Sequence, residues 1–222
     1  MKVIIYGATG MIGQGALRAC LNDPQVEAVL AVGRTATGVQ HAKLKELMML
    51  DLADYSHFDA ALAGYDACFF CLGTTVAGKT EAEYRRVTQG FTMAAAETLL
   101  RLNPQMTFVY VSAEGADSTE KGPVMWARVR GELENALLRM PFKGVYILRP
   151  AFIQPMDGEQ SKTPAYRMMY NAFKPLSPLI KKLFPSYATD TRVLGRAMIV
   201  LAGRGYEKTV LKSRDLNKAG KD

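Results

Sequence analysis

Histidine, cysteine and long apolar runs are scarce in this chain of 222 residues. With three cysteines and two histidines, it has no disulfide framework and no zinc-site pattern. No apolar run approaches the roughly 20 residues that cross a bilayer. The apolar run at residues 3–6 is also too short for a signal peptide. These scarcities predict a cytoplasmic protein with no bound metal.

The cysteine pair Cys68 and Cys71 has the spacing of a redox or metal motif. It falls within residues 67–72, an apolar segment typical of a buried strand. Residues three apart on a strand point to opposite faces of the sheet. We therefore interpret both cysteines as buried structural residues.

Positive charge is unevenly distributed along the chain. Residues 1–150 carry 15 basic and 15 acidic side chains, whereas residues 151–222 carry 13 and 6, which accounts for the whole net charge of +7. Two apolar helical stripes, at 165–173 and 176–183, run beside Lys174, Lys181 and Lys182. One interpretation is a lobe that covers the substrate; the other is a weak contact with an anionic membrane or an acidic protein. Nucleic-acid binding is not expected, because no recognised motif accompanies the charge.

Apolar segments of strand and helix character alternate from the first residue onward. Strands are predicted at 3–6, 27–32, 47–50, 67–72, 107–111 and 145–148, and helices at 11–21, 55–62, 81–102 and 123–138. This alternation predicts an α/β fold of the Rossmann type, with a doubly wound parallel sheet and a small C-terminal helical lobe. We expect a single NAD(P)-binding domain over residues 1–222, with a dinucleotide-binding core at 1–150 and the lobe at 151–222.

A glycine-rich loop follows the first predicted strand. Gly7, Gly10 and Gly13 have the spacing G-x-x-G-x-x-G, a variant of the dinucleotide-binding fingerprint. The first glycine permits a tight turn, the second lets the backbone approach a pyrophosphate, and the third allows close packing of helix on strand. The position between a strand and a helix is the context that the motif requires, so we expect a dinucleotide cofactor here.

The residues after the second predicted strand favour NADP(H) over NAD(H). NAD-binding proteins commonly carry an acidic residue there, which binds the ribose hydroxyls. This chain has Gly33-Arg34-Thr35 instead. A guanidinium pairs with the 2′-phosphate of NADP, although a solvated surface arginine is the alternative. Asp51, just beyond the third strand, is expected to reach the adenine edge or to cap the next helix.

Together with the glycine loop, Arg34, the segment Cys71-Leu72-Gly73-Thr74-Thr75 and Ser112, the chain resembles the short-chain dehydrogenase/reductase superfamily. It is most similar to an atypical branch that contains the Tat-interactive-protein-like proteins and bacterial epimerase-like NAD(P)H-binding proteins. The resemblance implies cofactor-binding roles at nine positions: Gly7, Gly10, Ile12, Gly13, Arg34, Leu72, Gly73, Thr74 and Arg130. With Asp51, which is expected from its place after the third strand, the expected cofactor-binding residues number ten. It also implies that Ser112 lies near the nicotinamide and orients the substrate.

The resemblance breaks at the acid/base of the reaction. Superfamily enzymes carry a tyrosine four residues before a lysine, on one face of the helix after strand five. Here Trp126 stands at the tyrosine position and Arg130 at the lysine position. Arg130 retains a cation for the ribose hydroxyls, but an indole N–H does not exchange protons near neutral pH. Ketone reduction by the family mechanism is therefore not expected.

Other residues are candidates for the proton donor. Tyr170 and Lys174 have the family spacing but lie after the sixth strand, outside the family position. Tyr84 begins the long helix after strand four, and Glu114 follows Ser112 closely. Packing or solvent exposure is the alternative role for both.

Two functional hypotheses follow from these residues. The first is an NADP(H)-dependent oxidoreductase or epimerase-like enzyme on a small substrate, with Ser112 and Arg130 in the site and a non-standard acid/base. The second is a non-catalytic NADP(H)-dependent sensor or scaffold that binds a protein or membrane partner. Trp126 favours the second hypothesis, whereas Ser112 and the cation at Arg130 favour the first.

Overall fold

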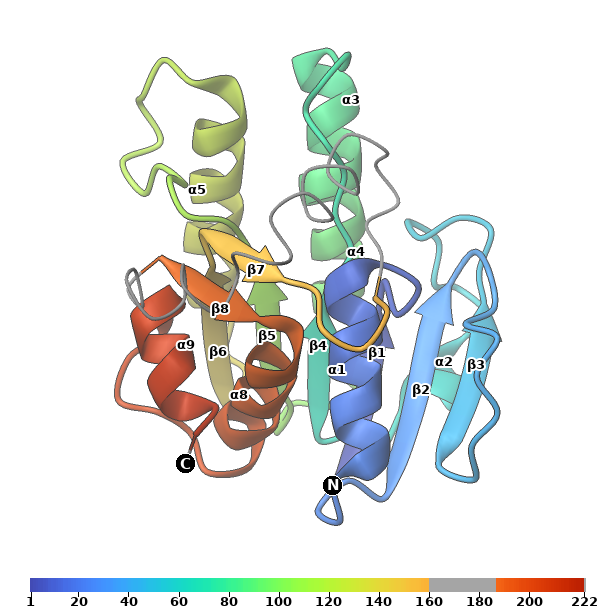
Figure 1. Cartoon of the computed structure of the whole chain (residues 1–222). Coiled ribbons are helices and arrows are strands. Elements are labelled where there is room, and N and C mark those ends of the chain that lie inside the picture. Colours follow the sequence, from blue (N-terminus) through green and yellow to red (C-terminus); the bar gives the residue numbers. More distant parts are fainter. Residues whose placement is uncertain (160–186, 222) are drawn as a thin grey trace.

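The computed structural model describes residues 1–159 and 187–221. Its centre is a parallel sheet of seven strands in the order β3-β2-β1-β4-β5-β6-β9, drawn in Figure 1. These strands are β1 (Lys2–Tyr6), β2 (Ala28–Gly33), β3 (Leu44–Met48), β4 (Ala67–Phe70), β5 (Thr107–Val111), β6 (Gly144–Arg149) and β9 (Val210–Lys212). The Rossmann-type α/β fold predicted from the alternating segments is confirmed.

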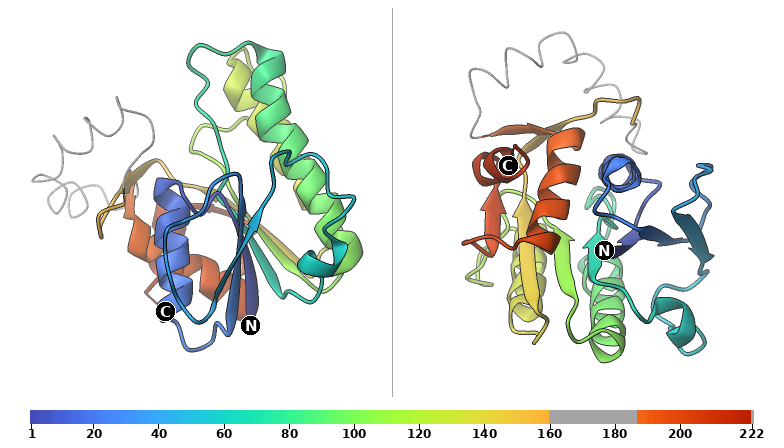
Figure 2. Two further views of the ribbon diagram at one scale, coloured as in Figure 1. Left: turned by 90° about the vertical axis from the view of Figure 1, so that its right-hand side faces the viewer. Right: turned by 90° about the horizontal axis from the view of Figure 1, so that it is seen from below.

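Helices cover both faces of the sheet, as Figure 2 shows. On one face lie α1 (Met11–Asn22), α8 (Thr191–Gly203) and α9 (Ser213–Ala219). On the other lie α2 (Asp59–Leu62), α4 (Phe91–Leu102) and α5 (Met125–Leu138). The helix α3 (Glu81–Arg85) continues through one π-helical turn, η1 (Arg86–Gly90), into α4.

Alternation along the central strands builds two separate hydrophobic cores. Ile5 and Phe69 pack in the core beneath α1 and α8, whereas Ile4 and Phe70 pack in the core beneath α4 and α5. Because both faces are covered, these strands are apolar at successive positions rather than at every second one.

The cysteine pair divides between the two cores. Cys68 is buried in the core beneath α4 and α5, and Cys71 packs against the other core. Burial raises the pKa of Cys71 to about 12. Burial also raises the pKa of Cys68, so both thiols stay protonated at neutral pH. Only Cys68 is the buried strand residue that was predicted, because β4 ends at Phe70 and Cys71 is half-buried just beyond it.

Some boundaries differ from those predicted. The third strand begins at Leu44, earlier than the apolar segment at 47–50, because an edge strand is half solvated and carries Lys45 and Glu46. The helix predicted at 81–102 contains the π-helical turn η1, for which apolar periodicity gives no signal.

Residues 187–221 return to the central sheet. The strand β9 pairs with β6, and α8 packs along α1. A second small sheet joins β7 (Phe152–Gln154) to β8 (Ala188–Asp190). The two apolar stripes and Lys174, Lys181 and Lys182 lie outside the described residues. Within 1–159 and 187–221, no helix is both long and apolar enough to cross a membrane.

Two glycines allow α1 and α8 to pack closely. A Cβ on Gly195 would lie 2.7 Å from the Cβ of Ala19, and a Cβ on Gly15 would lie 2.7 Å from the Cβ of Thr191. Both separations are shorter than any real contact, so each glycine is required by packing rather than by backbone conformation.

We predict that Gly195→Ala lowers the free energy of unfolding by about 1–3 kcal/mol, because the added methyl overpacks this contact. Urea denaturation measures the change. The matched control is Gly90→Ala, since no atom lies within 4 Å of a Cβ there. This control should be stabilised by about 0.5–1 kcal/mol. Equal effects of the two changes would contradict the prediction.

Candidate functional site

The turn between β1 and α1 is built around backbone contacts that exclude side chains. Gly7 has a φ of +75°, and a Cβ there would lie 2.8 Å from the amide nitrogen of Leu72. A Cβ on Gly13 would lie 2.1 Å from the carbonyl oxygen of Gly7. The first and third glycines therefore have the turn and packing roles that the fingerprint predicts.

The N-terminus of α1 faces the carboxyl edge of the sheet with unsatisfied amides. Gly10 caps this helix without a side-chain hydrogen bond, and the amide of Gln14 is the first to bond back, to the carbonyl oxygen of Gly10 at 2.8 Å. The amides of Met11, Ile12 and Gly13 thus have no acceptor within the helix. Such an end attracts anions through its amides and its partial positive charge.

A cavity of about 410 Å³ opens beside this helix end. Its walls come from the glycine loop and from the carboxyl ends of β2, β3 and β4. The lining residues are Gly7, Ala8, Thr9, Gly10, Ala31, Val32, Gly33, Arg34, Thr35, Thr37, Glu46, Met48, Leu52, Cys71, Leu72 and Gly73. The glycine cradle, the amides and a guanidinium at one end fit a phosphorylated dinucleotide.

Of the ten expected cofactor-binding residues, five line this cavity: Gly7, Gly10, Arg34, Leu72 and Gly73. Asp51 lies outside the lining, and its Oδ1 accepts from the amide of Ala53 at 2.9 Å, so it stabilises its own turn. Ile12 is partly buried and packs against the core beneath α1. Thr74 lies next to the lining residue Gly73.

Sequence analysis did not find the acidic residue of this cavity. Glu46 on β3 lies opposite Ala31 of β2, and its Oε1 accepts from the amide of Thr37 at 2.6 Å. It reaches the cavity because β3 is the neighbour of β2, which the chain order alone does not show. Arg34 is exposed, and within residues 1–159 and 187–221 its guanidinium has no hydrogen bond or ion pair.

A second group of polar residues lies where α3 and α5 rise beyond the sheet (Figure 1). Arg130 on α5 donates from Nε to the hydroxyl oxygen of Tyr84 on α3 at 3.0 Å. Its Nη1 lies 3.5 Å from the carbonyl oxygen of Val111, at the end of β5. Its Nη2 is 3.9 Å from the position of a Cβ on Gly73. Arg130 therefore lies between the residues that follow β4 and the end of β5.

Ion pairs fasten α3 to α5. Arg85 pairs with Glu132, and Gln89 donates to Glu132 at 2.9 Å. Arg128 pairs with Glu81 at 3.0 Å. The hydrogen bonds from Arg85 and Gln89 hold the pKa of Glu132 at about 2, so this carboxylate is charged at neutral pH. The two helices are therefore held together around Tyr84 and Arg130.

Ser112 is engaged within the protein. Its hydroxyl donates to Oε1 of Glu134, a carboxylate that is 1% exposed. Arg149 donates from Nε to the other oxygen of Glu134 at 2.9 Å. The serine proton is thus directed at a buried, paired carboxylate, and the hydroxyl remains able only to accept from a ligand.

Trp126, Arg130 and Glu134 share one face of α5, since they are four residues apart. The indole of Trp126 packs on Gly115, where a Cβ would lie 3.2 Å from Cη2. Glu114 points elsewhere, because its carboxylate pairs with Lys212 at 2.8 Å. Tyr84 is the candidate that lies beside Arg130, whereas Tyr170 and Lys174 are outside the described residues.

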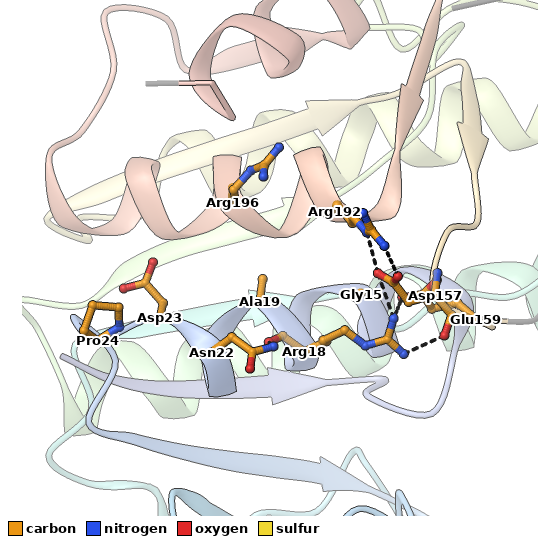
Figure 3. Close-up of a pocket in the computed structure, with 10 residues that line it drawn as sticks. All are labelled: Gly15, Arg18, Ala19, Asn22, Asp23, Pro24, Asp157, Glu159, Arg192 and Arg196. Carbon is orange, nitrogen blue, oxygen red and sulfur yellow. Dashed lines mark hydrogen bonds and ion pairs between the residues drawn. The ribbon is translucent and has the colours of Figure 1, made fainter. Parts of the chain in front are cut away.

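A different cavity, of about 560 Å³, lies between α1 and α8 (Figure 3). Arg18 and Arg192 point into it, and both pair with Asp157. Arg18 also pairs with the buried Glu159 at 3.0 Å. The arginines of this cavity are therefore largely neutralised by the acidic side chains that line it. The cavity also lacks the free helix terminus of the glycine-loop cavity. Among the described residues, no cluster of histidine, cysteine, aspartate and glutamate could hold a metal ion.

Residues 2–121, more than half of the chain, match the family model described as semialdehyde dehydrogenase, NAD binding domain. The chain belongs to this family. The match covers the glycine loop, the cavity and the strands that line it. This NAD-binding domain therefore binds a nicotinamide dinucleotide.

Solved structures share the fold of this NAD-binding domain. A short-chain dehydrogenase/reductase oxidoreductase from Burkholderia thailandensis superposes with a TM-score of 0.69 at 18% identity, over 98% of this chain and 92% of that one. A UDP-N-acetylglucosamine 4-epimerase from Methanobrevibacter ruminantium gives 0.70 at 15% identity, over 95% and 75%. The fold is therefore that of an atypical short-chain dehydrogenase/reductase-like protein, and at these identities the likeness concerns the fold alone.

Curated relatives correct the expected location. The fungal protein fmp52-1, mitochondrial, from Aspergillus terreus is 28% identical over 100% of this chain and 99% of its own length. The FMP52 protein, mitochondrial, from Meyerozyma guilliermondii is 23% identical over 100% and 96%. The names of these relatives point to mitochondria, so the cytoplasmic prediction is wrong. It failed because it relied on the lack of an apolar signal segment.

We predict that two glycine substitutions in the loop affect different properties, NADPH affinity at Gly10 and folding stability at Gly13. For Gly10→Val, the nearest atom to the Cβ is the carbonyl oxygen of Gly7 at 3.3 Å, a tight contact but a looser one than the 2.1 Å at Gly13, so we expect it to disturb the fold less than a change at Gly13. Its methyl groups obstruct the phosphate, and the Kd for NADPH should rise at least about tenfold. Gly13→Ala should instead lower the free energy of unfolding by about 1–3 kcal/mol. Calorimetry and urea denaturation measure both quantities, and full NADPH affinity in a folded Gly10→Val protein would exclude the loop as the site.

Proposed function

We propose that this chain is a single-domain, NADP(H)-dependent oxidoreductase that acts on a small carbonyl or hydroxyl substrate with a non-standard acid/base. The observation that carries the proposal is Arg34, whose guanidinium is free of ion pairs among the described residues and lines the same cavity as the glycine loop. When bound, the cofactor supplies or takes up a hydride. The chain itself supplies the anion site, the charge that selects the phosphate, and the groups beside the nicotinamide.

The residues divide this work by position. The amides at the start of α1 bind the pyrophosphate, while Arg34 and Thr35 bind the 2′-phosphate. Met48 and Leu52 supply apolar surface for the adenine. Arg130 binds the nicotinamide ribose, with Leu72, Gly73 and Thr74 along the same path. This assignment follows the rule that ligands of open α/β sheets bind at the carboxyl ends of the strands, where the strand order reverses.

A non-catalytic sensor is the second candidate, and Trp126 is the observation that favours it. The indole has no exchangeable proton near neutral pH, so the family reaction has no donor on α5. A sensor would bind NADPH and turn over no carbonyl compound. The contact of the basic C-terminal region with an anionic membrane or an acidic protein remains a proposal, because its apolar stripes lie outside the described residues.

We predict that NADPH binds more tightly than NADH, and that Arg34→Ala removes the preference by weakening NADPH about tenfold through loss of one exposed charge contact. The Kd for NADH should stay unchanged. Calorimetry with both cofactors measures the effect. The control is Arg214→Ala, which removes an exposed arginine from α9, away from the cavity lining.

Glu46 provides a complementary test of the same end of the cavity. Its carboxylate repels a 2′-phosphate, so Glu46→Gln should increase the preference for NADPH over NADH. The amide retains an oxygen that accepts from Thr37, which keeps the local hydrogen bond.

Equal Kd values for the two cofactors in the native protein, or a preference that survives Arg34→Ala, would contradict the assignment of Arg34.

A further inference from the structure

The helix α5 offers no proton donor, but a hydroxyl reaches the same cation from α3. The phenolic oxygen of Tyr84 accepts from Nε of Arg130 at 3.0 Å. Arg130 occupies the position of the family lysine, the cation beside the family tyrosine. Tyr84 therefore places a phenol against that cation from the opposite helix.

The proton of this phenol has no acceptor among the described residues. A guanidinium carries only N–H donors, so the oxygen of Tyr84 acts as acceptor toward Arg130 and its own proton points elsewhere. Tyr84 is only 2% exposed. Buried polar side-chain atoms normally have at least one hydrogen-bond partner, which Tyr84 has in Arg130, and the donor capacity of its hydroxyl is left over. The acceptor that fits is an oxygen that arrives with a ligand.

The neighbouring groups are less suited to exchange a proton. Burial raises the pKa of Tyr110 to about 12. The hydroxyl of Ser112 donates to Glu134, and Glu114 pairs with Lys212. Tyr84 is the phenol of this group that is bonded to the cation and has an uncommitted proton.

We propose that Tyr84 is the proton donor and acceptor of the reaction, an inference that rests on the proposed NADP(H)-dependent oxidoreductase function. In reduction, a hydride from the cofactor bonds to the carbonyl carbon of the substrate, and the π electrons move onto the carbonyl oxygen. The O–H bond of Tyr84 breaks, and its proton bonds to that oxygen to give an alcohol. Arg130 lies against the negative charge that develops on the phenolic oxygen, and solvent returns a proton to Tyr84 after the alcohol leaves. Oxidation runs in reverse.

Tyr84→Phe tests the proposal with benzaldehyde and diacetyl as probe substrates. Loss of a general acid should lower kcat/KM by at least about 100-fold, with the Kd for NADPH almost unchanged. The matched control is Tyr146→Phe, which also removes a buried hydroxyl that accepts one N–H, from Tyr206 at 3.0 Å, in the core beneath α8. Its kcat/KM should match that of the native protein.

A second readout needs no turnover. The near-ultraviolet absorbance of tyrosinate is followed through an alkaline titration of the native protein and of Tyr84→Phe, with and without NADP+. The difference between the two proteins isolates Tyr84. Because NADP+ carries a positive ring to this end of the site, its addition should change that difference curve, whereas the matching Tyr146 difference curve should not change.

The outcomes separate the two proposals. A protein that does not bind NADPH contradicts the proposed function. A native protein that binds NADPH but reduces neither probe also contradicts the oxidoreductase function and favours the sensor. If the native protein reduces a probe, the assignment of Tyr84 is overturned by either of two results: a Tyr84→Phe protein as active as the native one, or a Tyr84 difference curve that NADP+ leaves unchanged.

Discussion

The approach of α1 to the end of β1 is the contact on which the rest of the site depends. A Cβ on Gly13 would lie 2.1 Å from the carbonyl oxygen of Gly7, and a Cβ on Gly7 would meet the backbone of Leu72. Side chains at either position would push the helix away from the sheet. Without them, the free amides of α1 lie where β2 and β4 flank β1, which is the point at which the strand order reverses. The same contact therefore shapes the fold and leaves free amides at the carboxyl edge of the sheet, where we propose the pyrophosphate binds.

The other half of the site depends on charges rather than on close backbone packing. The helices α3 and α5 extend past the sheet and are joined by ion pairs of Arg85 with Glu132 and of Arg128 with Glu81. Beneath them, Glu134 is almost fully buried between Ser112 and Arg149. Separating Glu134 from Arg149 would leave a buried charge uncompensated, which is strongly destabilising. The cost of breaking this pair holds the arrangement in place. This arrangement positions Arg130 and Tyr84 against one another at the end of β5.

Membership of the NAD-binding family explains the cofactor-binding part of this protein but not its acid/base. The NAD-binding family match and the shared fold account for the glycine loop and the dinucleotide cavity. They do not account for the acid/base, because function depends on the side chains of a site rather than on the fold that carries them. The superfamily pair places a phenol beside a cation, both on the helix after strand five. Here Arg130 on α5 supplies the cation, and the phenol of Tyr84 comes from α3. A phenol beside a cation, the arrangement needed for proton exchange, is therefore present although α5 carries tryptophan.

The sequence by itself determined the sheet architecture and the cofactor loop, because both depend on local patterns. Apolar segments of strand length mark the central strands, and the glycine spacing marks the turn that joins β1 to α1. It also identified Arg34, since the residue after β2 is set by chain order. Half of the expected cofactor-binding residues line the cavity for this reason.

Only the tertiary structure decided which distant residues meet. Glu46 enters the cavity because β3 pairs with β2, and residues 210–212 return to the sheet beside β6. The sequence named Tyr84 and Glu114 as equal candidates for the proton donor, and their partners differ only in space: Arg130 for one and Lys212 for the other. Contacts between residues 46 or 98 positions apart leave no periodic trace in a single chain, because each depends on how separate elements pack.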